Sequence, residues 1–441
     1  MHRCFCRSIL PPALVATAAL LAPAFAIGSG DAPPPPASAT APADSPPPAI
    51  SLERAEALTL AANPTLGAME ASRRAADGAR LQAGEFPNPE LLLEAENFGL
   101  DLPGWRESEL TLSFAQPLET AGKRSRRVRE AEASREVARL ERDAVQLELR
   151  TELRRRFVVA LGRQERVQVL QENLRIAEET LNAVSELVRA GEVSPIEELK
   201  VDADASTSRT DLAKGEADLL VARRNVAALW GGGESDFGPL QGALAIPMEA
   251  PAVTDILPLI QASPNLARLK AEEERRVATL DLQRALARPD VTVAVGIRRF
   301  QFVEDNALVA GVGLPLPLFD RKKGAIAAAA AQRDQAMLLR QAELNRLHAD
   351  GLSAVTQLSA AISEASRLWE EVLPKVRRVY DSVEEGYRRG NFRLLELLDA
   401  RRSLTVAMLR YNDALVAAGL AAAELYFLTG GSPDSELGGM Q

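Results

Sequence analysis

Long stretches of the chain repeat apolar positions at alternating steps of four and three residues, which is the spacing of a coiled-coil seam. Between Ala121 and Ala190 the sequence contains no proline. The seam in this stretch consists of Leu170, Leu174, Ala177, Leu181, Val184 and Val188. The pattern predicts a helix of about 70 residues, which would be ~105 Å long at 1.5 Å per residue. Helices of that length are typical of coiled coils and tubes.

A second stretch has the same spacing and predicts a second helix of similar length. Its seam consists of Val355, Leu358, Ile362, Ala365, Trp369, Val372, Val376, Val379 and Val383. We expect a kink at Pro374, because proline has no backbone N–H and its ring clashes with the preceding turn.

Four shorter helical segments accompany the two long helices. They are residues 51–83, 195–230, 254–287 and 392–428. The first two, placed end to end, match one long helix in length, and the last two match the other. The start of the segment 195–230 is well marked. Ser194 is its expected N-cap, Pro195 lies in the first turn, and Glu197 is expected to close a capping box.

Four further segments alternate apolar and polar residues, the pattern of strands with one apolar face. They lie near residues 90–98, 109–116, 290–298 and 307–314. Their length suits tilted strands that cross a bilayer, although a half-buried sheet of a soluble protein has the same pattern. The polar face is acidic, which favours the wet lumen of a transmembrane β-barrel. The predicted lumen residues are Glu90, Glu94, Glu96, Glu109 and Asp290.

Short motifs recur after about 200 residues, which indicates an internal duplication. Asn63–Leu66 recurs as Ser263–Leu266, and Gly191 recurs as Gly390. This period exceeds the roughly 20–50 residues of a solenoid repeat. Each half is therefore expected to be a unit with a two-strand hairpin and long coiled-coil helices. The predicted divisions are repeat 1 at 50–232, an equatorial connector at 233–253, repeat 2 at 254–430 and a C-terminal tail at 431–441.

The first 26 residues have the features of a secretory signal peptide. Basic residues come first, an apolar run from Leu14 to Leu21 follows, and Ala24–Ala26 forms an A-x-A cleavage pattern. The alternative is a transmembrane anchor, which needs about 20 apolar residues. Residues 27–49 are rich in Pro, Ala and Ser and are expected to form a disordered tether.

Loss of the signal peptide changes the chemistry that the chain can offer. Both cysteines, Cys4 and Cys6, leave with it, and so does any disulfide or thiol nucleophile. Of 52 basic residues 50 remain against 61 acidic ones, a net charge of about −11, which argues against a nucleic-acid partner. His348 and the scattered methionines offer no metal motif. Hydrolase, nucleotide-binding and zinc-protease motifs are absent as well, so we expect no enzyme and no cofactor.

The strand number constrains the assembly. Four strands cannot close a barrel, and open sheet edges are not tolerated in lipid. Three copies would supply twelve strands, an even number within the known range. The predicted fold class is therefore mainly α with a transmembrane β-barrel, in a homotrimer that forms a 12-stranded barrel and a helical tunnel.

Three motifs resemble those of the TolC-like outer-membrane factors, over roughly residues 50–430. They are FPNPELLLEAENF at Phe86–Phe98, QPLETAGKR at Gln116–Arg124, and the stretch from Gly386 to Gly430 that begins GYRRGNFRLLELLDARRSL. The last is the most specific for the superfamily. The first two are similar to the cation-efflux branch typified by CzcC.

The resemblance implies a bacterial outer-membrane protein whose helices form a tunnel in the periplasm. It also implies contacts with outer-membrane lipid, a periplasmic adaptor of the membrane fusion protein class and an inner-membrane efflux transporter of the RND type. The exported substrate would be heavy-metal cations. Two alternatives remain open: an exit duct for drugs or for type I protein secretion, and a periplasmic coiled-coil adaptor or scaffold.

The same resemblance implies a gate at the narrow end of the tunnel. Family members carry an acidic segment there, which corresponds to Glu396 and Asp399, and a tyrosine that corresponds to Tyr387. Because one aspartate of the family pattern is replaced by Glu396, the diameter of the acidic ring is in doubt. Glu197 and Asp202 of repeat 1 are weaker candidates. Carboxylates near a helix start also favour the helix dipole, so an ordinary solvated face is the alternative.

Two helix-to-helix turns and two basic clusters complete the candidate residues. The turns contain Arg189 and Gly191, and Arg389 and Gly390, and by resemblance they meet the adaptor. The basic clusters are Lys123–Arg127 and Arg321–Lys323. Each follows a strand pair, where it would face anionic phospholipid headgroups.

Overall fold

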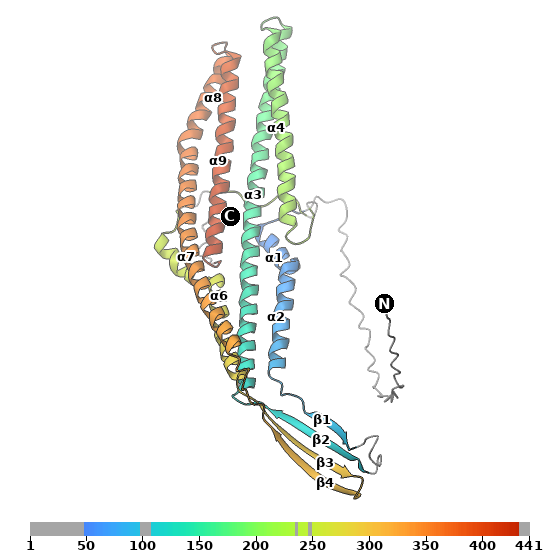
Figure 1. The fold of residues 1–441 in the computed structure, drawn as a ribbon. Coiled ribbons are helices and arrows are strands. Elements are labelled where there is room, and N and C mark those ends of the chain that lie inside the picture. Colours follow the sequence, from blue (N-terminus) through green and yellow to red (C-terminus); the bar gives the residue numbers. More distant parts are fainter. Residues whose placement is uncertain (1–47, 98–106, 234–236, 246–248, 432–441) are drawn as a thin grey trace, which may run out of the picture. The chain divides into compact units, whose positions relative to one another are not determined.

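The computed structural model describes residues 48–97, 107–233, 237–245 and 249–431 (Figure 1). The predicted signal peptide, most of the predicted tether and nearly all of the predicted tail lie outside these residues. The helices are α1 (Leu52–Ala62), α2 (Pro64–Ala83), α3 (Lys123–Arg189), α4 (Pro195–Ala227), α5 (Val253–Gln261), α6 (Pro264–Leu286), α7 (Lys323–Arg367), the π-helical segment η3 (Leu368–Val372), α8 (Leu373–Arg388) and α9 (Leu394–Leu428). The strands are β1 (Glu90–Glu96), β2 (Glu109–Leu118), β3 (Val291–Phe300) and β4 (Asp305–Gly313).

Helix α3 confirms the first predicted long helix, with 67 residues and no interruption. Its seam packs mainly against α4, and Leu170, Ala177 and Val184 are buried there. The close approach depends on Gly215 of α4, because a Cβ at that position would lie 2.8 Å from Leu170 Cδ1. The heptad spacing therefore identified both the helix and the face that it buries.

The second long helix is interrupted, and beyond the interruption the predicted seam is confirmed only in part: Val376 and Val383 pack against a buried cluster, but Val379 does not. The π-helical segment η3 lies directly before Pro374, which cannot donate the hydrogen bond that would continue the α-helix. A π-turn adds one residue to the helical turn and shifts the buried face by one position. Accordingly Val379 is 54% exposed, whereas the neighbouring Tyr380 is only 8% exposed.

Two of the shorter helical segments are also broken, each before a proline. Residues 51–83 divide into α1 and α2 at Asn63–Pro64, and residues 254–287 divide into α5 and α6 at Ser263–Pro264. A residue before proline is disfavoured in the α conformation. Asn63 makes use of the break: its Oδ1 accepts the Thr65 N–H at 2.9 Å, and its Nδ2 donates to the Leu229 carbonyl at 2.7 Å.

The start of the described chain packs against the segment that joins the repeats. Ile50 is buried and forms a parallel bridge with Leu240. The Gly238 N–H donates to the Pro48 carbonyl at 2.8 Å, so the predicted disordered tether extends too far by at least Pro48 and Ala49. The side chain of Gln164 in α3 accepts a hydrogen bond from the Leu240 N–H and donates one to the Leu240 carbonyl.

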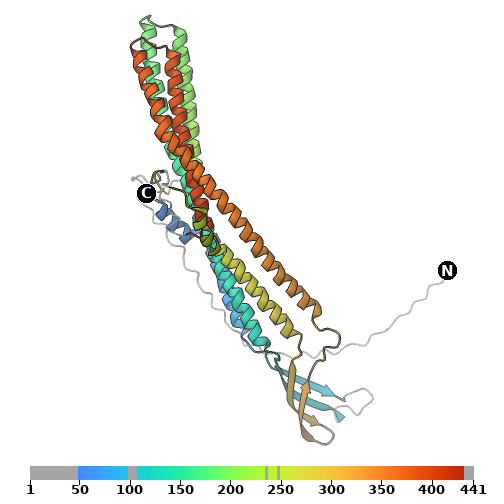
Figure 2. The ribbon, with the colours of Figure 1, turned by 90° about the vertical axis from the view of Figure 1, so that its left-hand side faces the viewer.

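The four strands form one antiparallel sheet in the order β1-β2-β3-β4, beyond the ends of α2, α3, α6 and α7 (Figures 1 and 2). The duplication extends to the register. Leu92 pairs with Ser113, and 200 residues later Thr292 pairs with Gly313. Alternation gives the sheet one continuous apolar face. Its largest exposed side chains are Leu91, Leu93, Leu110, Leu112, Phe114, Val293, Val295, Ile297, Leu308 and Val312.

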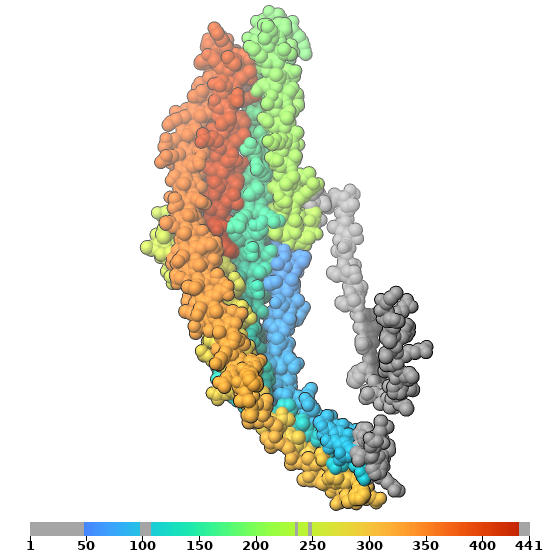
Figure 3. Space-filling model, viewed as in Figure 1, coloured from blue at the N-terminus to red at the C-terminus, as the bar shows by residue number. Residues whose placement is uncertain are grey.

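The helices supply no second apolar belt of this kind. Within the described part of the chain, none of them is long and apolar enough to cross a membrane. Helices α7 and α9 lie against each other along one side of the molecule (Figure 3).

Repeat 1 and repeat 2 are joined where α3 lies against α6 and α9, and small residues allow the backbones of α3 and α9 to approach closely. Gly162 of α3 receives Val416 of α9, since a Cβ there would lie 2.2 Å from Val416 Cγ2. Gly419 of α9 receives Val158 of α3 in the same way, with a 2.8 Å approach. Asn412 Nδ2 adds a buried hydrogen bond of 2.8 Å to the Gly162 carbonyl.

Replacing glycine by alanine should change the stability in opposite directions at two positions. Gly162→Ala should destabilise the protein by about 1–3 kcal/mol, because the new methyl group overpacks the joint between the repeats. Gly78→Ala in α2 meets nothing within 4 Å and should stabilise it by up to ~1 kcal/mol, since alanine favours the helix. Thermal unfolding followed by helical circular dichroism measures both changes. A Gly162→Ala protein as stable as the wild type would contradict the close packing of α3 on α9.

Candidate functional site

The two helix-to-helix turns have the same hydrogen bonds at equivalent positions, 199 residues apart. The Gly191 N–H donates to the Val188 carbonyl and the Glu192 N–H to the Leu187 carbonyl. In repeat 2 the donors are Gly390 and Asn391, and the acceptors are Tyr387 and Gly386. Gly191 and Gly390 have φ of 77° and 78°, which glycine adopts without strain. The structure thus confirms both predicted turns, with Arg189 and Arg389 exposed beside them.

The turn of repeat 2 contains a contact that sequence reasoning did not find. The ring of Phe392 lies directly on Gly386, where a Cβ would approach Phe392 Cδ2 to 2.2 Å. Any larger residue at Gly386 would displace the ring. The sequence indicated this contact only by a glycine inside a predicted helix, and glycine occurs at such positions for many reasons.

Tyr387 and Glu197, from different repeats, come together beside this turn. Tyr387 of α8 packs against the cluster of Val184, Val201 and Leu394. Its hydroxyl group is buried and has no hydrogen-bond partner within the described chain. Burial raises the pKa of Tyr387, and the nearby Glu197 carboxylate raises it further. Two of the predicted gate residues are therefore neighbours.

The capping box lies at Glu396 instead of Glu197, which corrects the prediction. Ser194 Oγ accepts the Ile196 N–H at 3.3 Å, and no reciprocal bond from Ser194 to Glu197 is found among the described residues. At the equivalent place in repeat 2, Glu396 Oε2 accepts the Arg393 N–H at 2.7 Å. Glu396 is exposed, but one of its carboxylate oxygens already stabilises the start of α9.

The remaining gate candidates, Asp399 of α9 and Asp202 of α4, are both exposed. Asp399 lies one turn after Glu396 on the same helix face, as the spacing predicted. Neither aspartate is drawn into the interior, so both carboxylates are in contact with solvent.

A buried ion pair that sequence reasoning missed lies one turn from these carboxylates. The Arg401 guanidinium of α9 bonds to Asp204 Oδ2 of α4, and thus joins repeat 2 to repeat 1. The side chain of Arg401 is 6% exposed and that of Asp204 is 34% exposed. Removal from water lowers the pKa of Arg401. Arg401 Nε and Nη1 have no partner within the described chain, so the burial is only partly compensated.

A second set of polar contacts follows one turn further from the helix-to-helix turns. Thr405 Oγ1 of α9 donates to Asn173 Oδ1 of α3 at 2.9 Å, and Asn173 Nδ2 donates to Ser208 Oγ of α4 at 3.1 Å. Arg401 and Thr405, like Asp204 and Ser208, are spaced i, i+4 and share a helix face. The two sets fix the rotation of α9 against α3 and α4.

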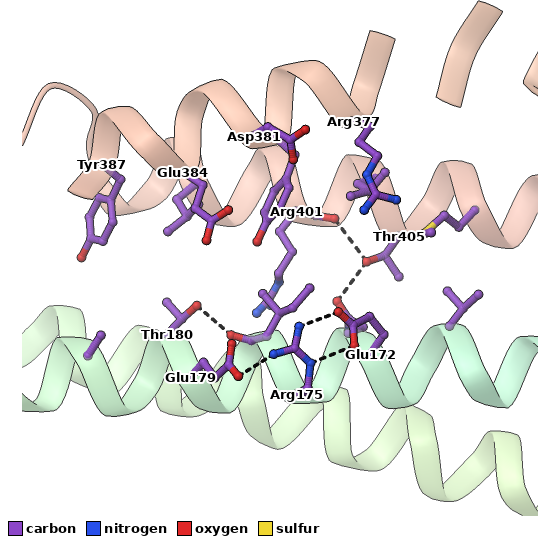
Figure 4. Close-up of a pocket in the computed structure, with 18 of the residues that line it drawn as sticks. Glu172, Arg175, Glu179, Thr180, Arg377, Asp381, Glu384, Tyr387, Arg401 and Thr405 are labelled. Atoms are coloured by element: carbon purple, nitrogen blue, oxygen red, sulfur yellow. Dashed lines mark hydrogen bonds and ion pairs between the residues drawn. The ribbon is translucent and has the colours of Figure 1, made fainter. Parts of the chain in front are cut away.

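Asn173, Arg401 and Thr405 line a groove of about 370 Å³ between α3, α8 and α9 (Figure 4). Figure 4 shows Arg401 extending from α9 towards α3, with Arg175 held between Glu172 and Glu179. Asp381 and Glu384 line the opposite wall. Acidic and basic side chains are interleaved, and no nucleophile–base pair occurs among the groups that line the groove.

The described residues also contain no group of three His, Cys, Asp or Glu side chains that could hold a metal ion.

The acidic face of the sheet has a basic residue at its centre, which sequence reasoning also missed. Arg298 Nη1 contacts Glu109 at 3.0 Å, Nη2 contacts Glu96 at 3.4 Å, and Nε donates to Thr111 Oγ1 at 2.9 Å. Glu94 lies opposite Thr111 in the register, and Glu90 is exposed at the start of β1. The four glutamates do share one face, but Arg298 offsets part of their charge.

Asp290, also a predicted lumen residue, makes structural contacts within the chain. It precedes β3 and bonds to the Lys123 ammonium group at 2.7 Å and to the Thr120 N–H at 2.8 Å. Lys123 is buried at the start of α3, where a cation opposes the helix dipole. The Asp290 carboxylate stabilises that cation and joins the two repeats.

The first basic cluster is likewise occupied by contacts within the chain. Arg124 lies over the Phe86 ring at 4.4 Å, Arg126 contacts Asp281 at 3.6 Å, and Arg127 pairs with Glu119. These contacts correct the expectation that Lys123–Arg127 faces lipid headgroups. In the second cluster Lys322 pairs with Asp320, and Lys323 is exposed.

Long paired helices with an antiparallel sheet beyond their ends, together with a charged region at the opposite helix turns, define the class of outer-membrane channel subunits. The family described as outer membrane efflux protein matches residues 57–232 and 258–431. The chain belongs to this family, and it is an efflux component of the bacterial outer membrane.

Two relatives carry names that refer to metals. The cobalt-zinc-cadmium resistance protein CzcC of Cupriavidus metallidurans is 34% identical over 369 residues, which are 83% of this chain and 86% of the relative. The nickel-cobalt-cadmium resistance protein NccC of Alcaligenes xylosoxydans xylosoxydans is 29% identical over 68% of this chain and 69% of its own. Among solved structures, the outer membrane protein VceC of Vibrio cholerae has a TM-score of 0.73 at 19% identity and covers 86% of this chain and 96% of its own.

The buried pair gives a second prediction. Asp204→Asn should cost about 1–3 kcal/mol, because it leaves the Arg401 charge buried without a carboxylate; the partial exposure of Asp204 keeps the cost below that of a fully buried pair. Asp202→Asn, two residues earlier and exposed, should change stability by less than about 0.5 kcal/mol. Arg401→Met combined with Asp204→Asn should recover most of the loss. Chemical unfolding of the wild type and these three variants measures the changes in stability. Equal costs for the two single aspartate variants would contradict a stabilising pair of Arg401 and Asp204.

Proposed function

We propose that three copies of this chain form a closed channel through which an efflux system exports heavy-metal cations. The observation that carries the proposal is the four-stranded sheet, which has one continuous apolar face and two unpaired edges, β1 and β4. Such a sheet satisfies its backbone groups in lipid only when copies close a barrel. Three copies give twelve strands, and their helices would continue the barrel as a periplasmic tunnel.

The division of the chain is part of this proposal. Residues 1–26 would direct export, and residues 27–47 would tether the mature start of the chain. Two repeats per copy would give the tunnel six similar units, joined within each copy by the contact of α3 with α9. The connector at 233–253 packs on α3 through Leu240 and Leu244 and would form a belt around the tunnel.

Metal cations are the favoured substrate for two reasons. CzcC and NccC, whose names refer to cobalt, zinc, nickel and cadmium resistance, cover most of this chain. The described carboxylates beside the helix turns, Glu396, Asp399, Glu197 and Asp202, would gather around one threefold axis, and rings of acidic groups favour cations. The chain would act as a passive conduit without catalysis, and an inner-membrane transporter would supply the energy.

Deletion of the gene tests the substrate. We expect reduced tolerance of zinc, cobalt or cadmium, restored by the full-length protein, because export would lose its exit. The membrane fraction should yield detergent-extracted trimers. A change in drug tolerance or protein secretion with unchanged metal tolerance would favour the first alternative duct. A protein that stays soluble after the membranes are removed would be an adaptor or scaffold instead.

The gate carboxylates can be tested in planar bilayers. Asp399→Asn should lower the preference for cations over anions, about two- to threefold for the loss of three charges on the axis. Glu396→Gln should lower it less, since Glu396 also caps α9. Asp334→Asn, which removes an exposed carboxylate from α7 far from the helix turns, is the matched control and should leave the preference unchanged. An Asp399→Asn channel with unaltered selectivity would exclude Asp399 from the conduction path.

The exposed turns are the proposed contact with the adaptor. Arg189→Glu and Arg389→Glu should each reduce cross-linking to the adaptor, because they reverse a charge at the farthest point from the sheet. Arg74→Glu, an exposed residue of α2, is the control and should cross-link like the wild type. Trimer assembly should be normal in all three variants. Unchanged cross-linking in both turn variants would place the adaptor elsewhere.

A further inference from the structure

The two repeats contain equivalent residues around the sheet, but only one of the two sets has its partners within the chain. Lys123, the first residue of α3, is buried against Asp290. At a shift of 200 residues the equivalents are Lys323, the first residue of α7, and Glu90, the first residue of β1. Gly122, before Lys123, has φ of 66°, and Lys322, before Lys323, has φ of 56°. Both helices therefore start after a residue in the left-handed conformation. Lys323 and Glu90 are both exposed and lie on opposite edges of the sheet.

The strands show the same difference. Strand β2 continues to Leu118, and its last residues pair with β3 up to Leu118 opposite Val291. Strand β4 ends at Gly313, and the equivalent residues 314–318 lie outside any strand. Their apolar side chains are largely exposed: Leu316 is 68% exposed and Leu318 is 63% exposed. Leu93 on the other edge is 63% exposed.

The prolines of this segment leave one edge available for pairing. N–H groups of successive strand residues point to alternate sides, so Pro315 and Pro317 lack donors on the same side. Leu314, Leu316 and Leu318 keep their N–H groups for the other side. The ladder between β3 and β4 stops at Gly313, two residues before Pro315, as expected if the prolines face β3. The donor-bearing side then faces outward from the sheet.

We propose that the segment 314–318 of one copy becomes a continuation of β4 by pairing with β1 of the next copy, and that Lys323 then bonds to Glu90 of that copy. The pairing of β2 with β3 sets the register. Gln116 lies opposite Val293, so Leu316 lies opposite Leu93 of the second copy, and Leu318 lies opposite Leu91. Leu316 and Leu318 would then continue the apolar face beside Leu93 and Leu91 of the second copy.

This inference rests on the proposed function, because it requires copies of the chain side by side in one barrel. It adds the register, the strand extension and a charge pair that orients neighbouring copies. Charge complementarity supports a second copy as the occupant: one edge ends in Lys323, and the other begins with Glu90. Lys323 corresponds to Lys123 and Glu90 corresponds to Asp290, and Lys123 and Asp290 form an ion pair inside the chain.

Cysteine pairs test the register. Leu316→Cys with Leu93→Cys should form disulfide-linked dimers and trimers on oxidation. The off-register pair of Leu316→Cys with Leu91→Cys should give about tenfold less, because the partners lie one pleat apart. Gln116→Cys with Val293→Cys is the equivalent pair inside one chain and should close without linking copies. The natural cysteines, Cys4 and Cys6, lie in the proposed signal peptide and should not interfere.

A charge swap tests the ion pair. Lys323→Glu and Glu90→Lys should each reduce the heat-resistant trimer about tenfold, since like charges then face each other across the joint. The double variant K323E/E90K should restore it, which a merely structural role of either residue would not produce. A double variant no better than the single ones would overturn the pair. If trimers form but the cysteine pair at Leu316 and Leu91 cross-links more than the pair at Leu316 and Leu93, the register is wrong and the proposed channel is unaffected. Absence of trimers from the outer membrane would instead overturn the proposed function and this inference together.

Discussion

The close contact between α3 and α9 is the interaction on which the other helix positions depend. Gly162 and Gly419 each receive a valine from the opposite helix, and Asn412 donates to the Gly162 carbonyl inside the contact. Helix α3 also packs against α4 and the short N-terminal helices of repeat 1 and against α6 of repeat 2, so its contacts with α9 and α6 together set the spacing between the repeats. Backbones this close tolerate almost no added volume, because a packed interior transmits such strain instead of absorbing it.

Duplication and asymmetry serve different purposes in this chain. The symmetric features are backbone features: the hydrogen bonds of both helix turns, the hairpin registers, and the left-handed residues before α3 and α7. The asymmetric features are side chains at equivalent places. Glu396 closes a capping box where Glu197 lies beside Tyr387 instead. A duplicated backbone preserves the overall geometry while side-chain substitutions distinguish one repeat from the other.

Charge in this protein is mostly local and paired. Arg298 lies among the acidic groups of the sheet, Lys123 is neutralised by Asp290, and Arg401 is neutralised by Asp204. The net negative charge of the chain therefore gives little indication of where negative potential is exposed. Exposed carboxylates such as Asp399 remain beside the helix turns.

The sequence by itself determined the elements whose signals are periodic or local. Heptad spacing predicted the whole of α3, alternation predicted the four strands, and glycine placement predicted both helix turns. It also identified Glu396 and Asp399 as neighbours on one face of α9. The tertiary structure alone decided which charges are paired, because Arg401 and Asp204 are 197 residues apart and no local pattern joins them. It also decided the seam beyond Pro374, where the helix after the π-turn buries Tyr380 in place of the predicted Val379. Periodicity depends only on neighbours along the chain, whereas pairing and phase depend on residues that folding brings together.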